Sequence, residues 1–147
     1  MQKPFEQVAR LLWVMEQLRD PDSGCPWDLQ QNFETIVPYT IEEAYEVADA
    51  IEHGDMDDIK DELGDLLFQV VFYAQLGKEQ GDFDFEAIAG AVSEKLIRRH
   101  PHVFGDTEVT SSDDVKQNWD LIKQQERQQQ GKDSDDSALA NIPKGLT

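Results

Sequence analysis

The sequence is poor in cations, and this shortage limits the partners it can bind. It contains 13 Lys+Arg against 31 Asp+Glu in 147 residues, a formal net charge of −18. Such a chain repels nucleic-acid backbones and anionic membranes unless its few cations gather in one place. We therefore expect no nucleic-acid and no membrane partner. An anionic small molecule would need a local basic patch or a bridging metal.

Cysteine and long apolar runs are also scarce. The single cysteine, Cys25, cannot form an intrachain disulfide, which suits a reducing compartment. No stretch has the length and apolarity of a membrane span. The N-terminus lacks the apolar core and cleavage site of a signal peptide. Together these features predict a cytoplasmic protein.

Apolar residues recur at helical spacing along most of the chain, and no stretch has the alternation typical of a strand. The five predicted helices cover residues 5–18, 38–53, 56–80, 85–100 and 113–130. The second begins near Pro38–Thr40, where Thr40 and Glu43 have the spacing of a capping box. Asp55 caps the third helix and Asp84 the fourth.

Short connections between such helices predict an all-α, antiparallel, four-helix-bundle-like fold. Residues 1–130 form the predicted domain. Residues 131–147 are polar and lack periodicity, which predicts a flexible tail or the start of a linker.

Polar residues form one line along the predicted helix 56–80. Asp58, Glu62, Asp65 and Gln69 follow steps of four, three and four, and most of the remaining circumference is apolar. A helix of this kind belongs inside a bundle. Buried, unpaired carboxylates are costly and become protonated unless something compensates them. A divalent cation would do so.

The predicted helix 38–53 carries acids that can meet this line. Across a short turn, the Glu43/Glu46 pair can approach the Glu62/Asp65 pair. Four carboxylates suit Mg²⁺, or Mn²⁺, better than zinc. No histidine has a glutamate three positions before it, which argues against a di-iron bundle. The apolar residues of helix 38–53 fall on one face, and its acids fall on the other. Taken alone, an ordinary solvated acidic face explains these acids.

Two further positions carry candidate substrate contacts. "KLIRRHPH" (Lys95–His102) places Lys95 and Arg99 on one side of the fourth helix, where they could bind phosphate. Stabilisation of the helix C-terminus by these cations is the alternative. Trp119 and Lys123 lie one turn apart on the fifth helix and could hold a nucleobase and a phosphate, although simple packing explains the tryptophan as well.

These residues resemble one family. "EEAYE" and "ELGD" carry the E-E-x-x-E and E-x-x-D pattern of the all-α nucleoside triphosphate pyrophosphohydrolases. "RDPDSGCPWD", "ELGDLLFQVVFYA" and "RRHPHVF" are similar to the MazG branch of that superfamily. The resemblance covers roughly Leu11 to Glu126.

The resemblance implies Mg²⁺-dependent hydrolysis of (deoxy)nucleoside triphosphates to the monophosphate and pyrophosphate by a homodimer. It implies metal ligands at Glu43, Glu46, Glu62 and Asp65. It implies substrate contacts at Lys95, Arg99, Trp119 and Lys123. Glu42 and Glu43 are the catalytic candidates, with Glu42 as a base or as a residue that supports the ligands.

One departure from the family leaves an alternative open. Bacterial members commonly hold two such domains in tandem, whereas this sequence carries one set of motifs. The alternative function is a weakly active or inactive domain that dimerises and binds nucleotide or metal beside an active second domain.

Overall fold

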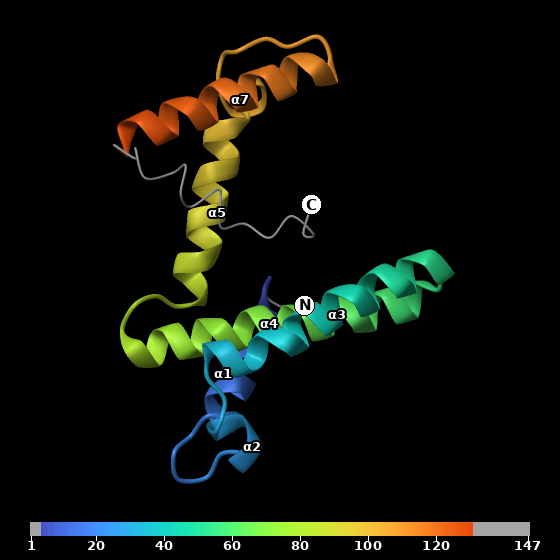
Figure 1. Ribbon diagram of the computed structural model, residues 1–147, viewed down its shortest axis with the longest axis vertical. Coiled ribbons are helices and arrows are strands. Elements are labelled where there is room, and N and C mark those ends of the chain that lie inside the picture. Colours follow the sequence, from blue (N-terminus) through green and yellow to red (C-terminus); the bar gives the residue numbers. More distant parts are fainter. Residues whose placement is uncertain (1–3, 131–147) are drawn as a thin grey trace. The chain divides into compact units, whose positions relative to one another are not determined.

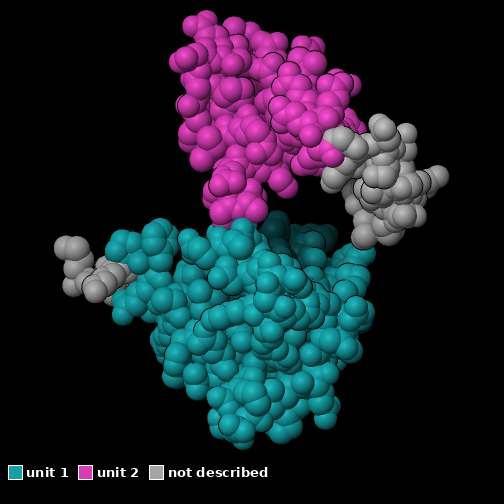
Figure 2. Space-filling view, turned by 90° about the vertical axis from the view of Figure 1, so that its left-hand side faces the viewer, with its two compact units in different colours: residues 1–89 teal, residues 90–147 magenta. Residues whose placement is uncertain are grey.

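A computed structural model of the chain describes residues 4–130, which form helices and no strand. This confirms the all-α prediction. None of the described helices is long and apolar enough to cross a membrane. The helices are α1 (Glu6–Leu18), α2 (Pro26–Leu29), α3 (Phe33–His53), α4 (Met56–Gln80), α5 (Phe85–Arg99), α6 (Pro101–Phe104) and α7 (Ser112–Gln129) (Figure 1). They belong to two compact units, Met1–Ala89 and Gly90–Thr147 (Figure 2).

In the first unit, α4 packs against both α3 and α1. The turn at Gly54 joins α3 and α4 into an antiparallel hairpin (Figure 1). Asp55 caps α4 as predicted, since its side chain accepts the N–H of Asp57 and of Asp58. The buried apolar cluster uses the C-terminal half of α4 and comprises Met15, Ile36, Val71, Phe72 and Leu76. The opposite end of the hairpin lies outside this cluster, and it carries the acids.

Arg19 fastens the loop after α1 to the end of α4. Its Nη1 donates to the carbonyls of Asp28 and Gln31, at 2.6 and 3.2 Å. Its Nε and Nη2 donate to the carboxylate of Glu79, at 3.0 and 2.5 Å. The guanidinium also lies 5.7 Å from the ring centroid of Phe72. A single half-buried cation therefore joins three segments of the first unit.

The predicted start of the second long helix is wrong. α3 begins at Phe33, because Asn32 and Thr35 form a capping box: each side chain accepts the other's backbone N–H at 2.9 Å. Pro38 lies inside the helix, where it has no N–H to donate to the preceding turn. Thr40 is no cap, since its hydroxyl donates back to the carbonyl of Ile36.

The apolar face predicted for α3 is not the face that packs on α4. Side chains facing α4 recur at steps of four and three and are buried or half-buried: Ile36, Thr40, Glu43, Val47 and Ala50. By contrast, Ile41, Tyr45 and Ile51 are 46%, 72% and 57% exposed. Glu43 therefore lies between the two helices, while much of the apolar surface of α3 is left open.

The part of α4 that precedes Val71 is also incompletely covered within the first unit. Leu63, Leu67 and Val70 are 47%, 39% and 36% exposed. Three long helices (α1, α3 and α4) make up this unit, so the predicted four-helix bundle is not complete within its described residues.

The second unit contains the C-terminal part of α5 together with α6 and α7. Asp84 caps α5 as predicted, accepting the N–H of Ala87 at 2.9 Å. Pro101 ends α5 as predicted but also opens the short helix α6. α5, α6 and α7 bury no residue fully. The tail predicted at 131–147 lies outside the described residues.

Candidate metal centre and anion-binding cleft

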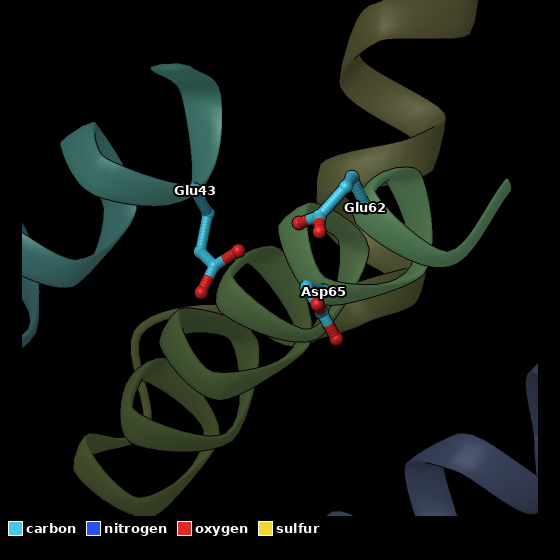
Figure 3. Close-up of side chains that lie close together, drawn as sticks. All are labelled: Glu43, Glu62 and Asp65. Carbon is cyan, nitrogen blue, oxygen red and sulfur yellow. The ribbon is translucent and has the colours of Figure 1, made fainter. Parts of the chain in front are cut away.

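Three carboxylates meet where α3 and α4 run side by side. Glu43 extends from α3, and Glu62 and Asp65 project from neighbouring turns of α4 (Figure 3). Each offers one carboxylate oxygen, and these three oxygens lie within 4.8 Å of one another. The antiparallel hairpin produces this approach, because it sets the inner face of α3 against the acidic line of α4.

The cluster is electrostatically unfavourable as it stands. Burial, followed by the charges of Asp65 and Glu62, raises the pKa of Glu43. Burial and the charges of Asp65 and Glu46 likewise raise the pKa of Glu62. Glu43 Oε2 is buried without a hydrogen-bond partner. Between residues 4 and 130, no lysine, arginine or histidine forms an ion pair with Glu43, Glu62 or Asp65.

This donor set fits a hard divalent cation. The raised pKa values of Glu43 and Glu62 and the unsatisfied buried oxygen of Glu43 show that these groups need a proton or a cation to become stable. All three ligand atoms are oxygen, the ligand type that Mg²⁺ and Mn²⁺ prefer.

The other two predicted acids lie outside the cluster. Glu46 is exposed and lines an adjoining acidic hollow of about 360 Å³, together with Asp49, Ala50, His53, Asp58 and Glu62. Glu42 is also exposed, and its charge contributes to the raised pKa of Glu43. Three of the four predicted ligands are therefore brought together, and the fourth, Glu46, borders Glu62 from the hollow.

Gln69 ends the polar line without needing a cation. It is 7% exposed, and its Oε1 accepts a hydrogen bond of 3.1 Å from the Thr40 hydroxyl. That hydroxyl also lies 2.6 Å from the hydroxyl of Tyr73. The polar line thus changes along α4 from charged groups without partners to neutral groups with partners.

In the second unit, predicted phosphate contacts gather around one cleft. Lys95 and Arg99 of α5 and Lys123 of α7 line a cleft of about 370 Å³. Its remaining lining consists of Arg98, Glu126, Arg127 and Gln130. Five cations therefore surround one opening in a chain with only 13. This is the local basic patch that an anionic partner of so acidic a protein requires.

Trp119 does not line this cleft. Its ring meets that of His100 edge-on, with centroids 5.3 Å apart, and its Nε1 is buried without a hydrogen-bond partner. Packing against His100 explains where the Trp119 ring lies. It does not explain why Nε1 has no hydrogen-bond partner.

Sequence reasoning missed Arg98, Glu126 and Arg127. Arg98 directly precedes a predicted contact, and helical steps of three and four place Glu126 and Arg127 beside Lys123. The signal was therefore present, but it needed α5 and α7 to be recognised as neighbours.

Comparison with known proteins identifies the family of the chain. Residues 31–104 match the MazG nucleotide pyrophosphohydrolase domain, so the chain belongs to the MazG family. The matched region includes the whole carboxylate cluster and the cations of α5.

Relatives extend the similarity over nearly the whole chain. It is 56% identical over 142 residues to the nucleoside triphosphate pyrophosphohydrolase of Escherichia coli (strain K12), covering 97% of this chain and 53% of that protein. The chain is also 49% identical over 123 residues to the nucleoside triphosphate pyrophosphohydrolase/pyrophosphatase MazG of Thermotoga maritima, covering 84% of this chain and 45% of that protein. The chain thus spans about half the length of these curated relatives.

A solved structure shares the fold. The crystal structure of a mazG-related protein from Thermotoga maritima superposes with a TM-score of 0.66 at 28% sequence identity. The match covers 79% of this chain and 98% of that one.

Proposed function

We propose that this chain is a Mg²⁺-dependent nucleoside triphosphate pyrophosphohydrolase, which cleaves (deoxy)nucleoside triphosphates to the monophosphate and pyrophosphate. The observation that carries the proposal is the Glu43–Glu62–Asp65 cluster on the α3–α4 hairpin of a MazG domain. The names of its relatives support the same reaction class. The lone cysteine supports a cytoplasmic location, where such substrates are found.

Glu43, Glu62 and Asp65 would hold the cation, and Glu46 is the proposed fourth ligand from the adjoining hollow. When bound, Mg²⁺ neutralises phosphate charge and acidifies or orients a water molecule; Mn²⁺ can replace it. Glu42 lies next to Glu43 in the chain but outside the cluster, so its carboxylate is available to accept a proton from water. Glu42 is therefore the proposed base, and support of the ligands is its alternative role.

The cationic cleft would bind the phosphates. Lys95, Arg99 and Lys123 can donate charged hydrogen bonds to phosphate oxygens and stabilise charge on the leaving pyrophosphate. Trp119 is proposed to contact the nucleotide through its aromatic face, one turn from Lys123 on α7.

We further propose that the chain works as a homodimer. Monomers seldom leave a large apolar patch uncovered, and six large apolar residues of α3 and α4 are exposed: Ile41, Tyr45, Ile51, Leu63, Leu67 and Val70. A second copy of this hairpin would cover them and complete the predicted bundle.

A second function is favoured by the length of the relatives. Because the chain spans about half of them, it could act as a weakly active or inactive domain that binds metal and nucleotide and dimerises. The cluster alone does not separate the two functions, since ligands can persist without turnover.

Pyrophosphate release from a panel of dNTPs and NTPs, with Mg²⁺ and with EDTA, tests the proposal. Metal-dependent release that Glu62→Gln abolishes would support the enzyme. No release, together with a melting temperature that Mg²⁺ raises, would support the binding module instead.

A further inference from the structure

The cationic cleft contains one acid, which phosphate binding does not explain. The side chain of Glu126 is 15% exposed, and both of its oxygens are engaged. Oε2 accepts from Nε of Arg98, and Oε1 accepts from Nη2 of Arg99 at 3.1 Å. A single carboxylate on α7 therefore holds two consecutive arginines of α5.

Without this bridge, the two arginine side chains would not point to the same side of the cleft. Consecutive residues of a helix point about 100° apart, and two neighbouring guanidinium groups repel each other. Arg98 and Arg99 are 51% and 26% exposed, so neither is fixed by burial alone. Glu126 draws both groups to the same side of the cleft.

The bridge leaves the arginines able to bind a second anion. A guanidinium has five N–H donors, and Glu126 accepts one from each arginine. In the described part of the chain, Lys95, Lys123 and Arg127 form no ion pair at all. A phosphate chain can therefore enter the cleft without displacing Glu126.

We propose that Glu126 is a positioning residue, which fixes Arg98 and Arg99 so that the cleft binds the phosphate chain of the substrate. The identity of that substrate rests on the proposed function. The two arginines also lower the pKa of Glu126, which keeps the bridge ionised at neutral pH. Glu126 thus acts through the arginines and not on the reacting atoms.

The first test measures binding without turnover. Inorganic tripolyphosphate is titrated into the metal-free protein by calorimetry, using the wild type, Glu126→Gln and Glu126→Asp. We expect Glu126→Gln to weaken binding about tenfold, since it removes the negative charge and leaves only one acceptor oxygen for two guanidinium groups. Glu126→Asp keeps the charge and should restore part of the affinity. Asp120→Asn, which removes the same charge from an exposed position of α7 outside the cleft, should leave binding unchanged.

The second test uses turnover, where the wild type shows it. Glu126→Gln should raise KM for the nucleotide about tenfold and change kcat much less, because positioning of phosphate ligands acts mainly on binding. Circular dichroism and melting temperature establish that the variants fold. Glu126→Asp serves as the folded comparison if the glutamine variant does not fold.

Tighter tripolyphosphate binding by Glu126→Gln would overturn the proposal, since Glu126 would then be a competitor of the phosphate. Unchanged binding would overturn it too, leaving Glu126 as a link between α5 and α7. A wild-type protein that binds no tripolyphosphate would also overturn the proposal. A chain without turnover whose affinity for tripolyphosphate falls in Glu126→Gln would contradict the proposed enzyme but support the role of Glu126.

Discussion

Glu43 lies on the inner face of α3, and this position separates it from the other acids of its helix. Glu42 and Glu46 are exposed, whereas Glu43 has a buried oxygen without a partner and approaches Glu62 and Asp65. The raised pKa of Glu43 means that the folded state holds its proton more tightly than the unfolded state does. In the absence of metal, the free energy of unfolding therefore falls as the pH rises through the raised pKa of Glu43 and the group loses its proton.

Removal of that charge should stabilise the metal-free protein and abolish its response to metal. We expect Glu43→Gln to melt at a higher temperature than the wild type in EDTA at neutral pH, because repulsion within the cluster is relieved. Mg²⁺ should raise the melting temperature of the wild type but not that of the variant. Differential scanning fluorimetry with and without MgCl₂ measures both effects.

Glu52→Gln is the matched control, since it removes one charge from an exposed position of α3 outside the cluster. It should keep the full response to Mg²⁺. A Glu43→Gln protein that Mg²⁺ stabilises as much as the wild type would contradict the assignment of Glu43 as a ligand.

The ion pair between Arg19 and Glu79 gives a pH-dependent prediction. Arg19 lowers the pKa of Glu79 below its ordinary value of 4.5, so the pair stabilises the fold above that value. Glu79→Gln should lower the free energy of unfolding at pH 7 by about 1 kcal/mol, because Glu79 is partly exposed and solvent weakens the pair. The difference from the wild type should shrink as pH falls below 4.5 and the wild-type carboxylate becomes protonated.

Urea unfolding of both proteins at pH 7 and at acidic pH measures this dependence. A difference that stays constant across the acidic range would show that Glu79 acts through packing and not through its charge.

At the level of elements, the α3–α4 hairpin creates the site, and the sequence predicted the two helices unequally well. Asp55 and Gly81 mark the ends of α4 by strong local signals, a side-chain cap and a left-handed glycine, and both positions were correct. The start of α3 was placed too late because Thr40 and Glu43 have the spacing of a capping box. The capping box of Asn32 and Thr35 overrides that signal.

The start of α3 can be tested directly. Asn32→Ala should destabilise the first unit by about 1 kcal/mol, since it removes the acceptor for the N–H of Thr35. Asn32→Asp keeps an acceptor oxygen and should be close to neutral. Chemical denaturation compares them, and an alanine variant as stable as the wild type would favour a helix that begins near Pro38.

The candidate site was predictable where helical spacing decides it and not where contacts between helices decide it. Glu62 and Asp65 follow from their line on α4, and Lys95 and Arg99 from theirs on α5. The bridge from Glu126 to Arg98 and Arg99 depends on how α5 and α7 approach each other, and spacing does not determine that. Amphipathicity also misplaced the covered face of α3, because it reports apolar surface without saying which partner covers it.

At the level of the whole molecule, that uncovered surface is the main argument for a second copy. Tyr45 is 72% exposed, so Tyr45→Glu should cost a single chain little. In a dimer that buries this face, the added charge should drive dissociation. Light scattering after size exclusion should show a dimeric wild type and a largely monomeric variant at micromolar concentration.

Glu52→Lys changes an exposed polar residue of the same helix and should leave the assembly intact. A monomeric wild type, or a Tyr45→Glu protein that remains dimeric, would contradict the proposed use of this surface.

In the proposed function, the carboxylate cluster supports hydrolysis of nucleoside triphosphates. Pyrophosphate release from dNTPs and NTPs tests it most directly, in Mg²⁺ and in EDTA, with Glu62→Gln beside the wild type. We expect release that requires Mg²⁺ and falls by at least about a hundredfold in the variant, because the variant loses a metal ligand that supports catalysis. Release that persists in EDTA, or that Glu62→Gln leaves unchanged, would contradict it.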